Sequence, residues 1–233
     1  MGVPDDETPG ASFASPPCLM HELDPAFGGI GVDAQQRTDV ARWRKAERER
    51  LIGARLAMPV AERQAFAERI IGRARDLIGN PAGRVVSAYW PFRGEPDLRP
   101  LMEWVVSCGG RPALPVVTGK GQPLTFRLWS PGEPLERGVW NIPIPAEGQA
   151  VVEPDIVIAP VVGFDPGCFR LGYGGGFFDR TLAARDPRPR VLGVGYARQG
   201  IATIFPQPHD IPMDAIITEA GVSEPPPGQK TEA

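Results

Sequence analysis

An apolar run that breaks into a cluster of glycines is the feature that most constrains how this chain can fold. Residues 156–162 read IVIAPVV, and residues 172–176 read GYGGG. A short β-branched run bounded by Gly and Pro is typical of a buried strand. Clustered glycines let backbone N–H groups converge on an anion, because no Cβ atoms intervene. The segment 155–180 therefore predicts a strand followed by a phosphate-binding loop, with Asp179 beside it as a candidate cation ligand.

Helices and strands are expected to alternate along the rest of the chain. Helical periodicity over residues 37–58 and 60–78 predicts an N-terminal helical pair. Further helices are expected over 97–107 and 177–184, and strands over 84–90, 112–117, 124–129, 156–162, 191–196 and 215–218. This alternation favours an open three-layer α/β sheet with helices on both faces. Ligands bind beyond the carboxyl ends of strands in such sheets, where residues 90–95 and 163–179 are expected to lie.

The length and composition indicate one globular domain with flexible ends. The chain has 233 residues and is 42% hydrophobic, with 28 glycines and 28 prolines. We expect a single domain over residues 37–222. Residues 1–36 are rich in Pro, Gly, Ser and Asp and are expected to form a disordered or docking arm, and residues 223–233 a disordered tail. The proline-rich residues 130–150 are expected to form a long ordered loop or a flap.

Charge and cysteine usage exclude several classes of function. The formal net charge is −3, which does not favour binding to nucleic acid or to an anionic membrane. No apolar run reaches the length of a membrane span, and the acidic N-terminus does not resemble a signal peptide. Three widely spaced cysteines without a CxxC motif favour a reducing compartment and argue against a zinc ribbon. We therefore expect a cytoplasmic protein.

The glycine cluster matches neither of two common nucleotide-binding motifs. GxxxxGK[ST] is absent, and residues 172–177 lack the third glycine of a dinucleotide fingerprint. The first predicted helix is strongly basic, with Arg42, Arg44, Lys45, Arg48, Arg50 and Arg55. Two interpretations of that helix remain open: a solvated charged face, or cations that reach a bound phosphate.

The longer string around the glycines resembles a family signature. Residues 162–180 read VGFDPGCFRLGYGGGFFDR. This string resembles FD-x-x-G-x-R-L-G-Y-G-K-G-Y-Y-D-R, the signature of the 5-formyltetrahydrofolate cyclo-ligases, also called methenyltetrahydrofolate synthetases. The resemblance covers about residues 40–220, including the basic first helix, the Y-x-P-x-x-x-E pattern at 89–95 and HDIPMDAIITE at 209–219. The fold of that family is an α/β sheet of the kind expected above.

The resemblance implies an ATP-dependent ring closure. ATP would phosphorylate the formyl oxygen of 5-formyltetrahydrofolate, the neighbouring folate nitrogen would attack, and 5,10-methenyltetrahydrofolate, ADP and phosphate would result. ATP is then a co-substrate and Mg²⁺ the expected cofactor. Such a reaction requires neutralised phosphate charge and an aligned γ-phosphoryl group. The implied partners are the two small-molecule substrates, and the expected oligomeric state is a monomer or a weak homodimer.

The resemblance also implies residue roles. Arg170 and Tyr173 are the candidate catalytic residues. The expected ATP contacts are Arg44 or Lys45, with Arg48, on the first helix, and Arg170, Leu171, Gly172, Tyr173, Gly174, Gly175, Gly176, Phe177 and Phe178 in the loop. The expected folate contacts are Trp90, Glu95, Tyr173, Gly174, Gly175, Gly176 and Phe177, because aromatic rings can stack on a pterin and a carboxylate can accept its N–H groups. Asp179 and Asp214 are the expected magnesium ligands.

Two departures from the family signature leave alternatives open. Gly175 stands where the signature has Lys, and Phe177 and Phe178 replace its two tyrosines. Losing one charge-assisted contact typically costs about 1.5–3 kcal/mol. Arg48, Arg170 or Arg180 are candidates to compensate. The alternatives are a paralogue that binds nucleotide or folate with altered or no cyclo-ligase activity, and a plain nucleotide-binding module.

Overall fold

The computed structural model describes residues 34–227. The chain divides into two compact units, Met1–Ala41 and Arg42–Ala233. In the first unit the described residues form the start of helix α1, where the Gln35 amide donates a hydrogen bond to Asp39. The arm expected over residues 1–36 thus lies almost wholly outside the described residues, as do residues 228–233 of the expected tail.

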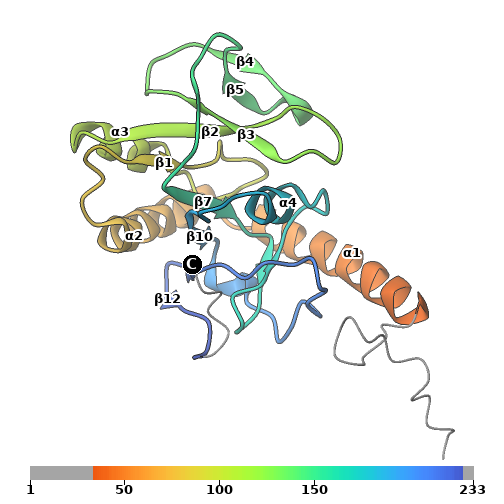
Figure 1. Cartoon of the computed structure of the whole chain (residues 1–233). Coiled ribbons are helices and arrows are strands. Elements are labelled where there is room, and N and C mark those ends of the chain that lie inside the picture. Colours follow the sequence, from red (N-terminus) through yellow and green to blue (C-terminus); the bar gives the residue numbers. More distant parts are fainter. Residues whose placement is uncertain (1–33, 228–233) are drawn as a thin grey trace, which may run out of the picture. The chain divides into compact units, whose positions relative to one another are not determined.

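The described part of the chain contains four α-helices, two short 3₁₀ helices (Val139–Asn141 and Ala197–Gln199) and twelve strands. Figure 1 shows their arrangement. The helices are α1 (Ala34–Leu56), α2 (Val60–Ile78), α3 (Arg99–Ser107) and α4 (Phe177–Ala183). The strands are β1 (Val85–Ser87), β2 (Arg111–Val117), β3 (Leu124–Leu128), β4 (Leu135–Arg137), β5 (Pro143–Pro145), β6 (Val151–Val152), β7 (Ile156–Pro160), β8 (Gly163–Phe164), β9 (Arg170–Leu171), β10 (Arg190–Val194), β11 (Ala215–Ile217) and β12 (Val222–Ser223). Among these helices none has the length and apolar character required to cross a membrane.

One mixed sheet organises the second unit. Its eight strands lie in the order β12-β11-β10-β7-β1-β2-β3-β6. The five strands from β11 to β2 run parallel to one another, and β12, β3 and β6 are antiparallel to their neighbours. Two short antiparallel pairs, β4 with β5 and β8 with β9, lie outside this sheet. The α/β fold expected from the alternation of elements is confirmed.

The central strand β7 shows why its sequence is almost wholly apolar. Ile156, Val157, Ile158 and Ala159 are all buried. Successive side chains of a strand point to opposite faces, and here Ile156 and Ile158 enter one core cluster while Val157 and Ala159 enter the other. A parallel strand that is covered on both faces therefore cannot alternate apolar with polar residues.

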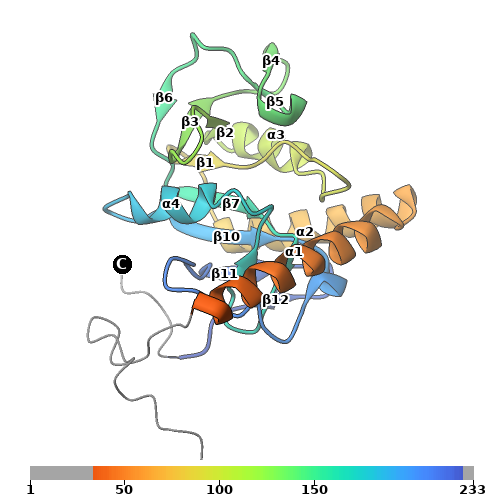
Figure 2. The same ribbon diagram turned by 90° about the vertical axis from the view of Figure 1, so that its right-hand side faces the viewer.

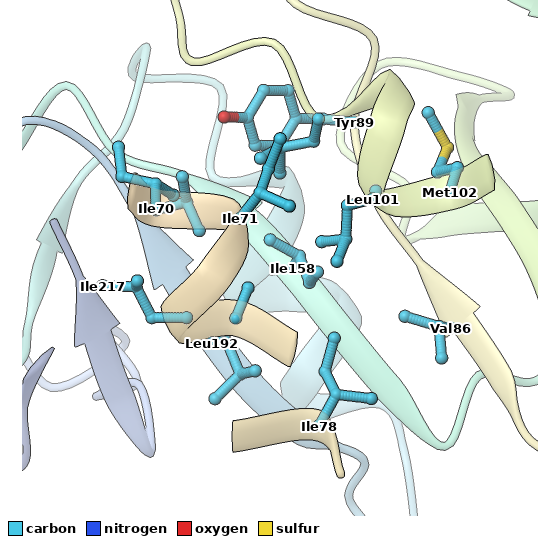
Figure 3. Packing of buried hydrophobic residues seen from close by; sticks show 14 of the residues in the cluster. Ile70, Ile71, Ile78, Val86, Tyr89, Leu101, Met102, Ile158, Leu192 and Ile217 are labelled. Carbon is cyan, nitrogen blue, oxygen red and sulfur yellow. The ribbon is translucent and has the colours of Figure 1, made fainter. Parts of the chain in front are cut away.

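Helices cover both faces of the sheet (Figure 2). Helices α2 and α3 pack on the face that carries Ile158 and Leu192, and α4 packs on the other face through Leu182. Figure 3 shows Ile70, Ile71 and Ile78 of α2 pointing into this first core cluster. Helix α2 has the bounds expected from its periodicity, and it ends at Gly79, whose N–H donates to Arg75 O at 2.9 Å and whose φ is +67°.

The region expected to be a loop or flap contains an unexpected hairpin. Within residues 130–150, strands β4 and β5 pair antiparallel, with Leu135 opposite Pro145. Each strand has only three residues and β5 begins and ends with proline, so neither gives a periodic signal. At the other end of the chain, β12 extends the sheet to Ser223, one residue into the expected tail.

The connections of β1 and β7 locate the place where a ligand is expected. These two strands are neighbours, but the chain leaves β1 toward β2 and leaves β7 toward β10, on opposite sides. Strand order reverses between them, and open α/β sheets bind ligands beyond the carboxyl ends of strands at such a point. The segments that follow the two strands, residues 88–96 and 161–176, begin at this edge.

Candidate active site

A pocket opens at the carboxyl ends of β1 and β7. Its lining comes from six parts of the second unit: helix α1, the segment after β1, the ends of β2 and β7, the hairpin region, the glycine loop with the start of α4, and residues 209–210. The lining side chains that carry charge are Arg44, Arg48, Glu95, Arg170, Asp179 and Asp210, and the aromatic ones are Tyr89, Trp90, Phe92, Trp140, Tyr173, Phe177 and Phe178, with His209 at 76% side-chain exposure. The pocket thus combines a charged region with an aromatic one.

The glycines of the loop make room for arginine side chains. A Cβ atom on Gly172 would lie 2.5 Å from Arg170 Nη1, and one on Gly176 would lie 2.7 Å from Arg180 Nη1. On Gly174 it would lie 3.3 Å from Arg48 Cζ, and this glycine has a φ of +93°. Alternate glycines therefore allow three guanidinium groups to lie against the loop backbone, which bulkier residues would keep at a distance.

Two carboxylates in the pocket are each paired with an arginine. Arg170 Nη2 lies 3.0 Å from Asp179 Oδ2, and the guanidinium of Arg170 also stacks on Phe178. Arg44 forms an ion pair with Asp210 and donates from Nε to Ile204 O at 2.9 Å. The four side chains in these pairs are between 6% and 14% exposed. Pairing and hydrogen bonds offset the cost of burying these charges.

Arg48 is the lining cation without such a pair. Its Nε donates to Gly172 O at 2.7 Å, and within residues 34–227 no carboxylate lies within ion-pairing distance of it. Burial, followed by the nearby Arg44 guanidinium, lowers the pKa of Arg48, although an arginine stays protonated at any physiological pH. A half-buried guanidinium held beside glycine N–H groups is suited to bind a phosphate.

Glu95 lies at the other end of the pocket and is deeply buried. Its side chain is 2% exposed; Oε1 accepts a hydrogen bond from Tyr173 Oη at 2.7 Å, and Oε2 accepts one from Phe92 N at 2.9 Å. Burial raises the pKa of Glu95 to about 7, although Arg55, the Tyr173 hydroxyl and the Phe92 N–H each oppose the rise. A carboxyl group with a pKa near neutrality in a cleft is a candidate for ligand recognition or proton transfer.

Aromatic rings line the same pocket as this carboxylate and pack on Tyr173, its hydrogen-bond partner. The Tyr173 ring lies 5.9 Å from Phe92 and 6.4 Å from Trp140 between centroids, and Trp90 makes an edge contact with Trp129 at 5.5 Å. Trp140 is 55% exposed and has a φ of +56°, followed by Asn141 at +62°. Consecutive left-handed residues without glycine are uncommon and concentrate at functional sites. A planar heterocycle with N–H groups on its edge suits such a region.

The structure brings nearly all of the sequence-predicted site residues to this pocket. Lining positions are taken by Arg44, Arg48, Trp90, Glu95, Arg170, Leu171, Gly172, Tyr173, Gly174, Gly175, Gly176, Phe177, Phe178 and Asp179. Lys45 is exposed and does not line it, so the geometry favours Arg44 over Lys45. Trp90, which sequence alone could assign equally to core or ligand, is half-buried, lining the pocket on one side and packing on the core on the other.

Asp214 is the other residue that the structure places elsewhere. Its Oδ2 accepts a hydrogen bond from Val191 N at 2.6 Å, Arg188 lies 3.8 Å from Oδ1, and it does not line the pocket. The aspartate that lines the pocket together with Asp179 is Asp210, four residues before Asp214. Because Ile211 N lies 3.4 Å from Asp179 Oδ1, the segment that carries Asp210 is held against Asp179. The geometry therefore favours Asp179 with Asp210, rather than with Asp214, as a metal-binding pair.

Three further functional candidates were missed by the sequence analysis. Asp210 lies in the same HDIPMD segment as Asp214, and no periodicity distinguishes the two in irregular backbone. Trp140 lies in the region expected to be a flap, where an isolated tryptophan among prolines was the available signal. Arg55 was noted only as a basic residue, but it is 0% exposed and lies 3.9 Å from Glu95. Its burial could not be read from a helix face that is rich in arginine.

The donor set of the pocket fits a magnesium ion shared with a phosphate ligand. No cluster of three or more His, Cys, Asp or Glu side chains placed to hold a metal occurs within residues 34–227. Of the three carboxyl groups that line the pocket, Asp179 and Asp210 lie on the segments that contact each other, and their hard oxygens are the atoms that Mg²⁺ prefers. Mg²⁺ commonly binds through one or two carboxylates together with substrate phosphates and water. Asp179 and Asp210 meet this description.

Fold and site together define a class of protein. The chain is an α/β protein whose pocket, at a topological switch point, joins an arginine- and glycine-lined end to an aromatic end with a buried carboxylate. The model of the 5-formyltetrahydrofolate cyclo-ligase family matches residues 40–219. A 5-formyltetrahydrofolate cyclo-ligase of Mycolicibacterium smegmatis is 31% identical over 178 residues, covering 73% of this chain and 91% of that protein. The chain belongs to the 5-formyltetrahydrofolate cyclo-ligase family.

Further relatives and solved structures agree. The 5-formyltetrahydrofolate cyclo-ligase of Escherichia coli K12 is 30% identical over 177 residues, covering 73% of this chain and 97% of that protein. The structure of Aquifex aeolicus 5,10-methenyltetrahydrofolate synthetase matches with a TM-score of 0.68 and 28% identity, covering 82% of this chain and 96% of the other. A synthetase of the same name from Mycoplasma pneumoniae matches with a TM-score of 0.62 at 20% identity, covering 76% and 98%, and bears on the fold alone.

Proposed function

We propose that this chain catalyses the ATP- and magnesium-dependent conversion of 5-formyltetrahydrofolate to 5,10-methenyltetrahydrofolate, with release of ADP and phosphate. The observation that carries the proposal is one pocket with two chemically different ends. One end has arginines and glycine-loop backbone, and the other has Glu95 among aromatic rings. Membership of the cyclo-ligase family supports the same assignment.

The nucleotide end suits a triphosphate. Arg48 carries no carboxylate partner within residues 34–227 and lies against Gly174, so its outer nitrogens are available to phosphate oxygens. Arg170 has a buried Nε without a hydrogen-bond partner, and it lines the same pocket. Guanidinium groups and loop N–H groups together would neutralise and orient the γ-phosphoryl group. Asp179 and Asp210 would hold Mg²⁺, which when bound supplies positive charge to the phosphate oxygens.

The folate end suits the pterin. An ionised Glu95 accepts hydrogen bonds, and the 2-amino group and ring N–H of a pterin present two donors on one edge. Trp90 and Trp140 line the pocket and offer flat aromatic surfaces for stacking. Tyr173 contacts Glu95 and follows directly on Gly172, so the pterin end and the phosphate end of the pocket lie side by side along the loop.

The reaction then follows from alignment of the two substrates. The formyl oxygen attacks the γ-phosphorus, the bond from that phosphorus to the β–γ bridging oxygen breaks, and ADP leaves. Folate N10 attacks the activated formyl carbon, the carbon–oxygen bond to the phosphate breaks, and N10 loses its proton. The side chains bind, orient and neutralise charge, which is where most catalysis of phosphoryl transfer originates.

The glycine at position 175 is compatible with this proposal. A Cβ on Gly175 would lie 2.7 Å from the Phe177 ring, so a lysine there would require that ring to move. The pocket instead has guanidinium groups from Arg44, Arg48 and Arg170 in its lining. These cations support turnover without the lysine of the family signature, and nothing in the pocket favours a paralogue without activity.

An assay of product formation tests the proposal. The purified chain is mixed with MgATP and 5-formyltetrahydrofolate, and the absorbance of the methenyl product is followed together with ADP. We expect both products to form, and neither to form when magnesium is removed with a chelator. Binding of folate without product would contradict the catalytic proposal and favour a non-catalytic paralogue. Absence of folate binding would leave only a nucleotide-binding module.

Location and assembly remain predictions within this proposal. A cytoplasmic location is expected from the cysteine usage, and a monomer or weak homodimer is expected in solution. Cell fractionation measures the first, and sedimentation at several protein concentrations measures the second.

A further inference from the structure

A fully buried arginine lies behind the folate end of the pocket. Arg55, near the end of α1, is 0% exposed and does not line the pocket. Its Nε donates to Arg93 O at 2.9 Å, and its Nη2 donates to Tyr173 Oη at 2.5 Å. The same nitrogen lies 3.9 Å from Glu95 Oε1. Arg55 therefore contacts the segment after β1 and the glycine loop at once.

The chemistry of these three side chains fixes the direction of one hydrogen bond. A guanidinium group only donates, whereas a tyrosine hydroxyl has one proton and also accepts. Because Arg55 donates to the Tyr173 hydroxyl, the single proton of that hydroxyl is directed to Glu95 Oε1, 2.7 Å away. Glu95 is thereby held as an acceptor, with its second oxygen fixed by Phe92 N–H.

Neighbouring tyrosines cannot take over this role. The Tyr89 hydroxyl donates to Pro96 O at 3.0 Å, and the Tyr196 hydroxyl donates to Gly94 O at 3.2 Å. Burial raises the pKa of Tyr89 well above its usual range and that of Tyr196 to about 12, so both remain neutral at physiological pH. Arg55, the Tyr173 hydroxyl and the Phe92 N–H all oppose the effect of burial on the pKa of Glu95, and Arg55 is the one among them that carries a positive charge.

We propose that Arg55 is a positioning residue for the reaction, which sets the proton direction of the Tyr173–Glu95 hydrogen bond and keeps Glu95 ionised as the acceptor for the donor edge of the pterin. The assignment of the pterin to Glu95 rests on the proposed function, but the effect of Arg55 on Glu95 exists without any ligand. The two parts can therefore be measured separately.

The first measurement uses the protein without ligand. Titration of Glu95 is followed by NMR of carboxyl-labelled glutamate, with Glu95→Gln to assign the signal. Arg55→Gln replaces the donor-only cation by a neutral amide that can accept the Tyr173 proton. We expect the Glu95 midpoint, near 7 in the parent, to rise by about one unit or more in this variant. Tyr173→Phe, which keeps the ring, is expected to raise the Glu95 midpoint as well. This variant replaces Arg55→Gln in the titration if Arg55→Gln does not fold.

The second measurement uses folate and separates a positioning role from a structural one. Folate KM is expected to rise as pH falls through the Glu95 midpoint, because protonated Glu95 no longer accepts the ligand N–H groups. In Arg55→Gln this rise is expected to begin at higher pH: a midpoint shift of about one unit increases folate KM roughly three-fold near pH 7.5 and about ten-fold well below both midpoints. ATP KM is expected to change little, and Arg55→Lys is expected to restore part of the effect.

A matched control and a double variant complete the test. Arg185 also bridges buried backbone, donating to Thr181 O and Leu124 O, but lies outside the pocket. Arg185→Gln is expected to lower stability without moving the pH dependence of folate KM.

Combining Arg55→Gln with Tyr173→Phe is expected to raise folate KM less than the product of the single effects, because both act on one hydrogen bond.

The outcomes distinguish the two proposals. If Arg55→Gln lowers stability and leaves the Glu95 titration unchanged, Arg55 is only structural and the inference is overturned. An unchanged Glu95 titration in folded Tyr173→Phe would overturn the inferred hydrogen-bond direction. If the titration shifts as expected but the parent protein binds no 5-formyltetrahydrofolate, the link between Arg55 and Glu95 stands, and the proposed function is the part that fails.

Discussion

At the scale of single residues, each of the two aspartates in the pocket is neutralised by an arginine. Arg170 pairs with Asp179 and Arg44 pairs with Asp210, so the two acidic side chains do not lie buried and alone. Removing one partner of a buried pair leaves an uncompensated charge, which is more costly than the pair itself. The same four groups offer cations to a phosphate and oxygens to a metal ion.

The choice between the two candidate metal carboxylates gives a prediction at this scale. Asp210→Asn is expected to raise the magnesium concentration required for turnover, or to lower turnover, by about 10- to 100-fold, because a charged contact is worth roughly 1.5–3 kcal/mol. Asp214→Asn is the matched control, since its side chain bonds to Val191 N outside the pocket, and an amide oxygen can still accept that bond. The measurement is the rate of methenyl formation across a magnesium titration.

Thermal unfolding of both variants provides the control for stability. If Asp214→Asn, correctly folded, were the variant with the altered magnesium dependence while Asp210→Asn behaved like the parent, the assignment of the metal site would be wrong.

At the scale of elements, the glycine loop has a glycine at every second position, and the sequence alone does not show why. Sequence reasoning placed a phosphate loop there because glycines expose backbone N–H groups. The structure adds that Gly172, Gly174 and Gly176 each lie against an arginine from a different position: Arg170, Arg48 and Arg180. Arg48 belongs to α1, so this contact is nonlocal and could not be inferred from spacing within the loop.

The loop spacing leads to a second prediction. Gly174→Ala is expected to destabilise the protein by about 1–3 kcal/mol, because its φ of +93° is strained for alanine. It is also expected to raise ATP KM, since the new Cβ would lie 3.3 Å from Arg48 Cζ. Gly72→Ala is the matched control: it lies in α2 with nothing within 4 Å of the added Cβ, and is expected to stabilise by roughly 0.5–1 kcal/mol.

Urea unfolding and ATP KM are measured for both glycine variants. Gly174→Ala with the stability and the ATP KM of the parent would show that neither the backbone conformation nor the contact with Arg48 matters.

The elements differ in how well their sequences predict them. Helix α2 and strand β7 have long, consistent apolar patterns, and both were expected close to their observed bounds. The pair of β4 and β5 was not expected, because each strand has only three residues and β5 begins and ends with proline, so neither carries a periodic signal. That hairpin region supplies Trp140 to the pocket, so the missed element also hid a site residue.

At the scale of the whole second unit, alternating patterns predicted an open α/β sheet but not its strand order. Strand β1 lies between β7 and β2, a neighbour relation between segments about 70 residues apart, as in the pairing of Val86 with Ile156. Such pairings depend on nonlocal packing that local propensity does not encode. The expectation that ligands bind beyond the carboxyl ends of the strands nevertheless predicted the edge of the sheet at which the pocket lies.

The same nonlocal packing explains why the site was predicted in part. Glu95 follows β1 and Tyr173 follows β7, so the fold class alone predicts that both lie at the carboxyl edge of the sheet. Asp210 and Arg55 reach the site through contacts with Arg44 and Tyr173 that span more than 100 residues, and no local pattern indicates them.

The central claim is that one pocket joins MgATP to 5-formyltetrahydrofolate so that phosphoryl transfer depends on both. The most direct measurement is the ratio of ADP to methenyl product, together with ADP formation when folate is omitted. We predict one ADP for each methenyl formed, and no ADP above background without folate. ADP formed at the same rate without folate, or methenyl product formed without ADP, would contradict the claim.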